Sequence, residues 1–158
     1  MGFERYKRSP DGFRELVELW ESTPVSRRQR MIEVGMDEDA EYAQLILSYM
    51  ITFEDVLLLP DLELAELIST APARIVALSI CRAADDVKQR FKKNTMSRNM
   101  AELRDSLEEL GEETPLRDIG GAQLKMIEFT RKLEKMGKIK TKRIPHGVTK
   151  KVEPSNED

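Results

Sequence analysis

Apolar residues recur along most of this chain every three or four positions, the spacing that places them on one face of an α-helix. The clearest segment runs from about Ser97 to Leu110. Its apolar stripe follows positions i, i+4, i+7, i+11 and i+14 and consists of Met96, Met100, Leu103, Leu107 and Leu110. No segment alternates apolar and polar residues long enough to predict a strand. The pattern therefore predicts an all-α protein in which this helix buries one face.

Charged residues occupy the opposite side of the same helix. They stand two positions away from the apolar ones, which is about 200° around the helix axis. The set consists of Arg98, Glu102, Asp105 and Glu109. We expect this charged stripe to face solvent, as the polar side of a surface helix does.

Helix breakers and capping residues divide the first third of the chain into three short helices. The first is predicted over about 11–22 and ends before Pro24. Gly35 is expected to end a second short helix, because glycine favours the position that follows a helix C-terminus. Asp37 or Asp39 is expected to open the third helix as its N-cap.

The same signals mark helices in the rest of the chain. Thr52 and Asp55 form a capping-box pattern at the start of a short helix. The last helix is predicted over about 118–136, and Gly137 is placed to end it. Beyond this glycine the apolar periodicity stops and basic residues dominate, so the pattern predicts a disordered tail over 138–158.

Composition excludes several classes of function. The 158 residues are 40% hydrophobic and 35% charged, which is a globular balance. The net charge of −3 makes the whole chain a poor match for nucleic acid. No apolar run approaches the roughly 18 residues of a membrane-spanning helix, and the N-terminus lacks an apolar signal core. We therefore expect a cytoplasmic protein that is not transmembrane.

No motif for catalysis or cofactor binding stands out. The sequence has no phosphate-binding loop, no dinucleotide-binding glycine pattern and no His-Glu-x-x-His. The single cysteine, Cys81, excludes an intramolecular disulfide and is expected to be a buried apolar side chain. The single histidine, His146, lies in the tail. We predict that the protein is not an enzyme and has no catalytic residue, cofactor, metal ligand or small-molecule substrate.

The basic tail raises the question of anion binding. Six lysines and arginines lie between Lys138 and Lys151 and have the charge to contact the phosphate groups of nucleic acids or lipids. No aromatic residue is interleaved with them, and the chain ends in acidic residues. These two features favour a solvated tail, and binding to an anionic surface is the alternative.

An ordered set of short segments follows the first third of the chain. Met50–Phe53 is a Met-x-x-Phe segment that precedes an acidic pair and a leucine-rich turn. Ala84–Lys88 and the charge-bearing helix Asn94–Leu110 come next, and a closing helix ends in Gly137–Ile139. In their order and spacing, over about residues 35–139, these segments resemble the C-terminal region of the FliG family of flagellar motor switch proteins.

The resemblance implies an all-α fold, with an armadillo-like helical unit followed by a six-helix C-terminal unit. It divides the chain into a basic, irregular N-terminal segment 1–10, armadillo-like helices 11–50, a FliG C-terminal-like helical domain 51–137 and the disordered tail 138–158. The family's hinge between the two units corresponds here to Met50, Ile51, Thr52 and Phe53.

The resemblance also implies a rotor or switch component at the inner-membrane face of the flagellar basal body. In the family, charged residues of the C-terminal unit meet the cytoplasmic loop of a MotA-type stator protein and contribute to torque or switching. The matching positions are Arg82, Arg98 and Asp105, and Arg117 is expected to substitute for a further arginine. Ser106 stands where the family commonly has a second aspartate. Other switch proteins, such as FliM or FliG, are further implied partners.

Two domains of the family have no counterpart in this sequence, namely the N-terminal domain that binds FliF and the middle domain that binds FliM. We therefore expect a short stand-alone relative. The alternative function is a FliG-like scaffold or regulator, which binds a partner through apolar helix faces and produces no torque.

Overall fold

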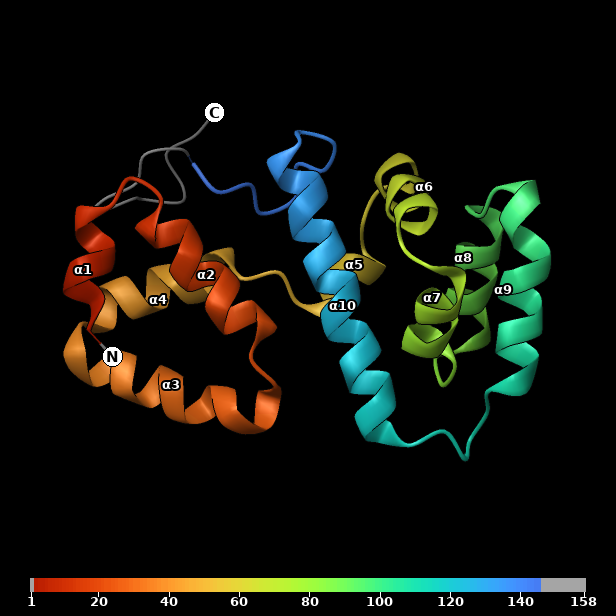
Figure 1. Ribbon diagram of the computed structural model, residues 1–158, viewed down its shortest axis with the longest axis horizontal. Coiled ribbons are helices and arrows are strands. Elements are labelled where there is room, and N and C mark those ends of the chain that lie inside the picture. Colours follow the sequence, from red (N-terminus) through yellow and green to blue (C-terminus); the bar gives the residue numbers. More distant parts are fainter. Residues whose placement is uncertain (1, 146–158) are drawn as a thin grey trace. The chain divides into compact units, whose positions relative to one another are not determined.

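The computed structural model describes residues 2–145, which fold into helices joined by short connections (Figure 1). No strand occurs among these residues, so the predicted all-α fold is confirmed. The helices divide into two compact units. Unit 1 comprises the described residues up to Ile51 together with those from Lys142 onward, and unit 2 is Thr52–Thr141.

The helices follow one another with few intervening residues. Those of unit 1 are α1 (Phe3–Arg8), α2 (Gly12–Ser22), α3 (Val25–Glu38) and α4 (Ala40–Tyr49). Those of unit 2 are α5 (Phe53–Leu57), α6 (Asp61–Thr70), α7 (Ala73–Ile80), α8 (Asp85–Lys93), α9 (Ser97–Glu109) and α10 (Leu116–Lys135).

Aromatic side chains form the centre of unit 1. The ring centroid of Phe3 lies 5.0 Å from that of Tyr42 and 6.4 Å from that of Trp20. The ring of Phe13 meets that of Tyr49 edge-on, with 5.6 Å between centroids. All five side chains are buried in one cluster. Burial of large rings from α1, α2 and α4 therefore makes a substantial contribution to the hydrophobic stabilisation of this unit.

The N-terminal residues, which we expected to be irregular over 1–10, instead form helix α1. Phe3 is fully buried in the core of unit 1. The carboxylate of Glu38 accepts hydrogen bonds from the backbone N–H groups of Gly2 and Phe3, at 2.7 Å each. The hydrogen bonds to Glu38 span more than thirty residues of sequence, and the apolar periodicity of residues 1–10 gave no sign of this helix.

Gly35 does not end a helix, contrary to the sequence-based expectation. Helix α3 continues to Glu38, and Gly35 is buried in its interior. A Cβ atom at this position would lie 2.9 Å from Cζ of Phe3 and 3.1 Å from Trp20. The glycine therefore permits close packing of α3 on the core, and Asp39 separates the two helices. The carboxylate of Asp39 caps α4 by accepting from the N–H of Tyr42.

In unit 2, α7 packs against both α9 and α10, and α5 and α6 contact α10. The predicted capping box at the start of α5 is present: the Thr52 hydroxyl accepts from the Asp55 N–H, and the Asp55 carboxylate accepts from the Thr52 N–H. Of the apolar stripe on α9, only Leu103 is fully buried; Met96 is 48% exposed. The core of this unit is therefore centred on α7 and α10 more than on α9.

The prediction of a disordered tail from residue 138 is wrong for residues 138–145. Gly137, at φ 78°, ends α10, and the Lys138 N–H donates to the carbonyl of Leu133 at 2.9 Å. Ile139 is fully buried, and Ile144 belongs to the core of unit 1. The rest of the predicted tail, with His146, lies outside the described residues.

Candidate partner-binding surface

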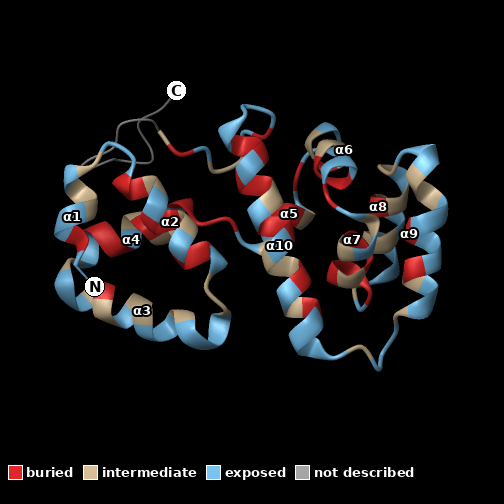
Figure 2. Cartoon of the chain, viewed as in Figure 1, coloured by how far each residue is buried: buried red, intermediate tan, exposed pale blue. Residues whose placement is uncertain are grey.

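Arg98 and Asp105 lie on the solvent-facing side of α9. Both side chains are exposed, together with those of Glu102 and Glu109, as the charged stripe predicts. In Figure 2 much of the α9 ribbon has the pale blue of exposed residues. The seven-residue spacing between Arg98 and Asp105 corresponds to about 10 Å along the helix axis, so one cation and one anion lie two turns apart.

Within residues 2–145, the side chains of Arg98 and Asp105 take part in no hydrogen bond or ion pair. Glu109 differs, because its carboxylate lies 3.4 Å from the guanidinium of Arg74. A charged group without a partner in its own fold keeps its full capacity for pairing with another protein. Arg98 and Asp105 are therefore available for an intermolecular contact, as are other exposed charges of α9 such as Glu102.

Arg82 is exposed but already has a structural role. It follows the end of α7, and its guanidinium donates a hydrogen bond to the backbone carbonyl of Glu112. This bond ties the end of α7 to the connection between α9 and α10. Arg82 is thus a surface cation whose position is fixed by the fold of unit 2.

Arg117 lies in the first turn of α10 and is exposed, on a different element from the charges of α9.

Ser106 is buried. A carboxylate at that position would have to leave water, which is costly for a charged group. The departure from the family's second aspartate therefore agrees with an inward-facing side chain.

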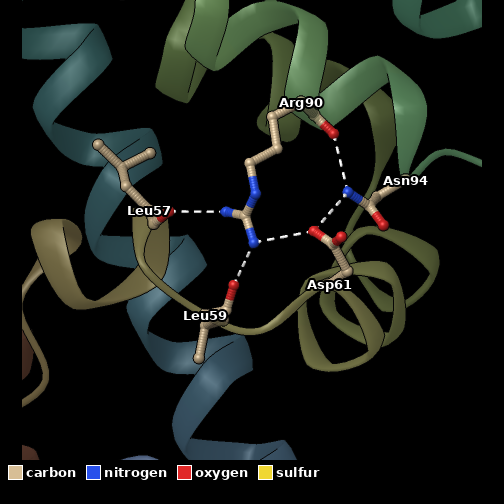
Figure 3. A network of polar contacts seen from close by, with 5 residues as sticks. All are labelled: Leu57, Leu59, Asp61, Arg90 and Asn94. Carbon is tan, nitrogen blue, oxygen red and sulfur yellow. Dashed lines mark hydrogen bonds and ion pairs between the residues drawn. The ribbon is translucent and has the colours of Figure 1, made fainter.

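A polar network that the sequence patterns did not predict holds the connection between α5 and α6 against α8 (Figure 3). The guanidinium of Arg90 donates to the carbonyl oxygens of Leu57, at 2.8 Å, and Leu59. It also lies 3.0 Å from the carboxylate of Asp61, which accepts a second hydrogen bond from Asn94 at 3.3 Å. One planar, permanently charged group thus fixes three points of the neighbouring loop.

This fixed loop presents two apolar side chains to solvent. Leu58, at the end of α5, is 81% exposed and Leu62, in the first turn of α6, is 88% exposed. Isolated exposed leucines are common on proteins, but two on one rigid turn form a candidate apolar contact. The leucine-rich composition of this turn was visible in the sequence, whereas the outward direction of these two side chains was not.

Residues 2–145 contain no cluster of metal-ligating side chains. No group of histidine, cysteine, aspartate or glutamate side chains among these residues is arranged to hold a metal ion. Cys81 is buried, as expected.

A shallow cavity of about 200 Å³ lies between the α6–α7 connection and α9, lined by residues that include Ala71, Pro72 and Leu103. None of the described helices is long and apolar enough to cross a bilayer.

The sequence of this chain is similar to that of known flagellar motor switch proteins. Residues 36–141 match the family model of the FliG C-terminal domain. A flagellar motor switch protein FliG from Thermotoga maritima is 30% identical over 128 residues, and that from Borreliella burgdorferi is 28% identical over 131 residues. The matches cover 81% and 83% of this chain. In both cases the chain spans 38% of the length of the relative.

Solved structures agree with this match at the level of the fold. The crystal structure of Helicobacter pylori FliG residues 86–343 superposes with a TM-score of 0.61 at 23% identity, covering 82% of this chain and 60% of that one. Full-length FliG from Aquifex aeolicus superposes with a TM-score of 0.51 at 24% identity. The match covers 80% of this chain and 39% of that one. The relatives are named as motor switch proteins, which agrees with the expectation that this chain is not an enzyme.

Proposed function

Because the chain belongs to the FliG C-terminal domain family, we propose that it is a cytoplasmic component of the flagellar motor switch at the inner-membrane face of the basal body. In this proposal, the charged side of α9 contacts the cytoplasmic loop of a MotA-type stator protein and contributes to torque or switching. Other switch proteins, such as FliM or FliG, hold the chain in the rotor.

The observation that carries this proposal is that the side chains of Arg98 and Asp105 are exposed and unpaired within residues 2–145. A stator loop that carries an anion and a cation about two helical turns apart would be complementary to this pair. Arg82 and Arg117 add positive charge on other parts of the same unit.

The strength of such contacts suits a moving interface. An exposed ion pair contributes only about 0.2–1 kcal/mol, so a contact made of a few pairs forms and breaks quickly. Salt screens these charges over about 8 Å at physiological ionic strength, which restricts their action to the passing loop. Electrostatic complementarity of this kind favours fast association and selects the partner.

Within this proposal, Met50, Ile51, Thr52 and Phe53 act as the hinge between unit 1 and unit 2. The boundary between the two units falls between Ile51 and Thr52, which supports that assignment. Hinges are short segments at the ends of elements, where a few backbone angles change. Here the segment runs from the end of α4 to the start of α5.

Charge reversal tests the stator contact. We expect Arg98→Glu and Asp105→Lys each to weaken binding of a MotA-type cytoplasmic loop and to reduce swimming in cells that carry the variant as their only copy. Arg104→Glu is the matched control, because Arg104 is exposed on α9 but lies about 120° away from Arg98 around the helix. Unchanged loop binding and unchanged swimming in both variants would refute the contact.

A second candidate function is a scaffold or regulator that binds its partner through an apolar surface. The exposure of Leu58 and Leu62 on one rigid turn favours this reading. A Leu58→Ser, Leu62→Ser double variant separates the two functions, because a torque contact through α9 does not need these leucines. Loss of partner binding in this variant, with full binding in the two charge-reversal variants, would favour the scaffold.

A further inference from the structure

The chain passes between the two units twice. The first pass lies between Ile51 and Thr52, and the second between Thr141 and Lys142. Unit 2 is therefore inserted into unit 1 and does not simply follow it. The described residues beyond the second pass include Lys142 and Ile144, and we call Lys142–Ile144 the C-terminal clasp.

Ile144 anchors the clasp in unit 1. Its side chain is 3% exposed and belongs to the same buried cluster as Phe13, Tyr49 and Met50. Its carbonyl oxygen accepts a hydrogen bond from the guanidinium of Arg14 on α2 at 3.3 Å. An isoleucine buried to this degree has the packing of a core residue, although it lies well over one hundred residues away from Arg14 in sequence.

Lys142 connects the clasp to the first pass. Its Nζ donates a hydrogen bond to the backbone carbonyl of Met50 at 2.8 Å. The backbone of Lys142 has a φ of 51°, a left-handed conformation that a residue other than glycine keeps only where its surroundings compensate. The contact with Met50 and the burial of Ile144 provide that compensation.

The backbone at the end of α4 is therefore held by two charged side chains. The ammonium group of Lys142 binds the carbonyl of Met50, and the carboxylate of Glu21 accepts from the N–H of Ile51 at 2.8 Å. Both backbone groups lie in the segment that we assign as the hinge. Hydrogen bonds to charged groups are stronger than those between neutral groups, so these two contacts oppose rotation about the backbone bonds of Met50 and Ile51.

We infer that the C-terminal clasp is a latch on the hinge. While Ile144 is docked and Lys142 is bonded to Met50, the segment 50–52 is rigid. When the clasp releases, the hinge is free to change its backbone angles. The hinge of this chain is thus controlled by residues that follow unit 2 in sequence. This inference rests on the hinge assigned in the proposed function, but it concerns contacts within unit 1 and does not depend on whether α9 binds a stator.

Hydrogen exchange of the full chain, read by mass spectrometry, tests the latch. Lys142→Met removes the ammonium group but keeps the aliphatic stem, and Ile144→Ala removes the anchor. We expect exchange in peptides covering 50–53 to become about tenfold faster in both variants, the effect of losing one charge-assisted contact. Arg143→Ala is the matched control, because Arg143 is the exposed residue between them, and it should leave exchange unchanged.

The fluorescence of Trp20 separates release of the latch from unfolding. Trp20 is the only tryptophan and is fully buried in unit 1, so its emission stays blue-shifted while that unit is folded. Faster exchange at 50–53 with unchanged emission supports the latch. Two results would overturn it: exchange at 50–53 within about twofold of the wild type in Lys142→Met, or an equal acceleration across α2, α4 and the hinge in that variant.

Discussion

Gly35 brings helix α3 so close to Phe3 that a Cβ atom at position 35 would lie 2.9 Å from Cζ of the phenylalanine ring. The indole of Trp20 bounds the same space at 3.1 Å. Both rings are fully buried, so neither can move into solvent to make room. The absence of a side chain at one position therefore determines how closely α1, α2 and α3 pack.

The first prediction is that Gly35→Ala destabilises unit 1. Overpacking of a dense core typically costs about 1–3 kcal/mol, which exceeds the gain of roughly 0.5–1 kcal/mol from replacing a glycine inside a helix. Urea denaturation followed by circular dichroism measures the difference. Gly121→Ala is the matched control in α10, because nothing lies within 4 Å of a Cβ there, and it should increase stability. Equal stability of Gly35→Ala and the wild type would contradict the packing argument.

The second prediction concerns acid stability and rests on Asp39. The hydrogen bond from Lys7, at 2.6 Å, and the N–H of Tyr42 hold the pKa of this carboxyl below its ordinary value of 3.8. A carboxyl group whose pKa is lower in the folded state stabilises the protein at pH values above its unfolded-state pKa. This contribution disappears as the pH falls through the folded-state pKa. We expect unit 1 to lose stability as the pH falls below 3.8.

Asp39→Asn tests this dependence, because asparagine keeps an oxygen to cap α4 but cannot ionise. The variant should be less stable than the wild type at pH 7, and the two should become similar in acid. Denaturant titrations monitored through Trp20 at several pH values measure the difference. A gap that stays constant down to the most acidic pH at which both fold would argue against Asp39 as the titrating group.

The third prediction concerns Tyr42 in alkali. Burial, followed by the nearby negative charge of Asp39, raises the pKa of Tyr42 to about 12. A raised pKa means that the folded state resists ionisation, so stability is retained below the ordinary value of 10.0 and is lost as the pH rises toward 12. We expect the ultraviolet absorbance of the Tyr42 phenolate to appear only in this range, together with unfolding of unit 1.

Tyr42→Phe provides the comparison. Within residues 2–145 the buried hydroxyl of Tyr42 has no hydrogen-bond partner, so its removal relieves an unsatisfied polar group. The variant should be at least as stable as the wild type at pH 7 and should tolerate alkali better. A clear loss of stability at pH 7 would mean that the hydroxyl makes a contact that stabilises the fold.

The fourth prediction is that Arg90→Met loosens the loop between α5 and α6. The substitution keeps the stem but removes the bonds to Leu57 and Leu59 and the ion pair with Asp61. We expect a loss of about 1–3 kcal/mol in the free energy of unfolding and faster hydrogen exchange at 57–61. Gln89→Ala, at the exposed preceding position, is the control. Arg90→Lys should recover little of the stability lost in Arg90→Met, because an ammonium group lacks the planar guanidinium that reaches several acceptors at once.

Local patterns in the sequence predicted those parts of the fold that depend on neighbouring residues. The charged side of α9 follows from helical spacing, and the Thr52–Asp55 capping box follows from a four-residue motif. Gly35 was misread because its role depends on Phe3, which lies 32 residues away in sequence and on another helix. A glycine that ends a helix and one that permits close packing look the same in a single sequence.

The clasp and the Arg90 network escaped the sequence analysis for the same reason. Ile144 stands in a run of basic residues that is typical of a solvated tail, and its burial depends on the core of unit 1, which exists only after folding. Arg90 reads as one of several cations on α8. Its role arises from backbone carbonyl groups, which every residue carries and which therefore leave no mark in the sequence.

Because unit 2 is inserted into unit 1, the two units can be considered for separation or exchange at two points of the chain. The bond between Lys142 and the carbonyl of Met50 brings the side chain at one cut end of unit 1 into contact with the backbone near the other. A short glycine-containing bridge from Ile51 to Lys142 would close the smaller unit into a separate miniprotein. The same contact makes residues 52–141 a segment that can be tested as an exchangeable insert in unit 1.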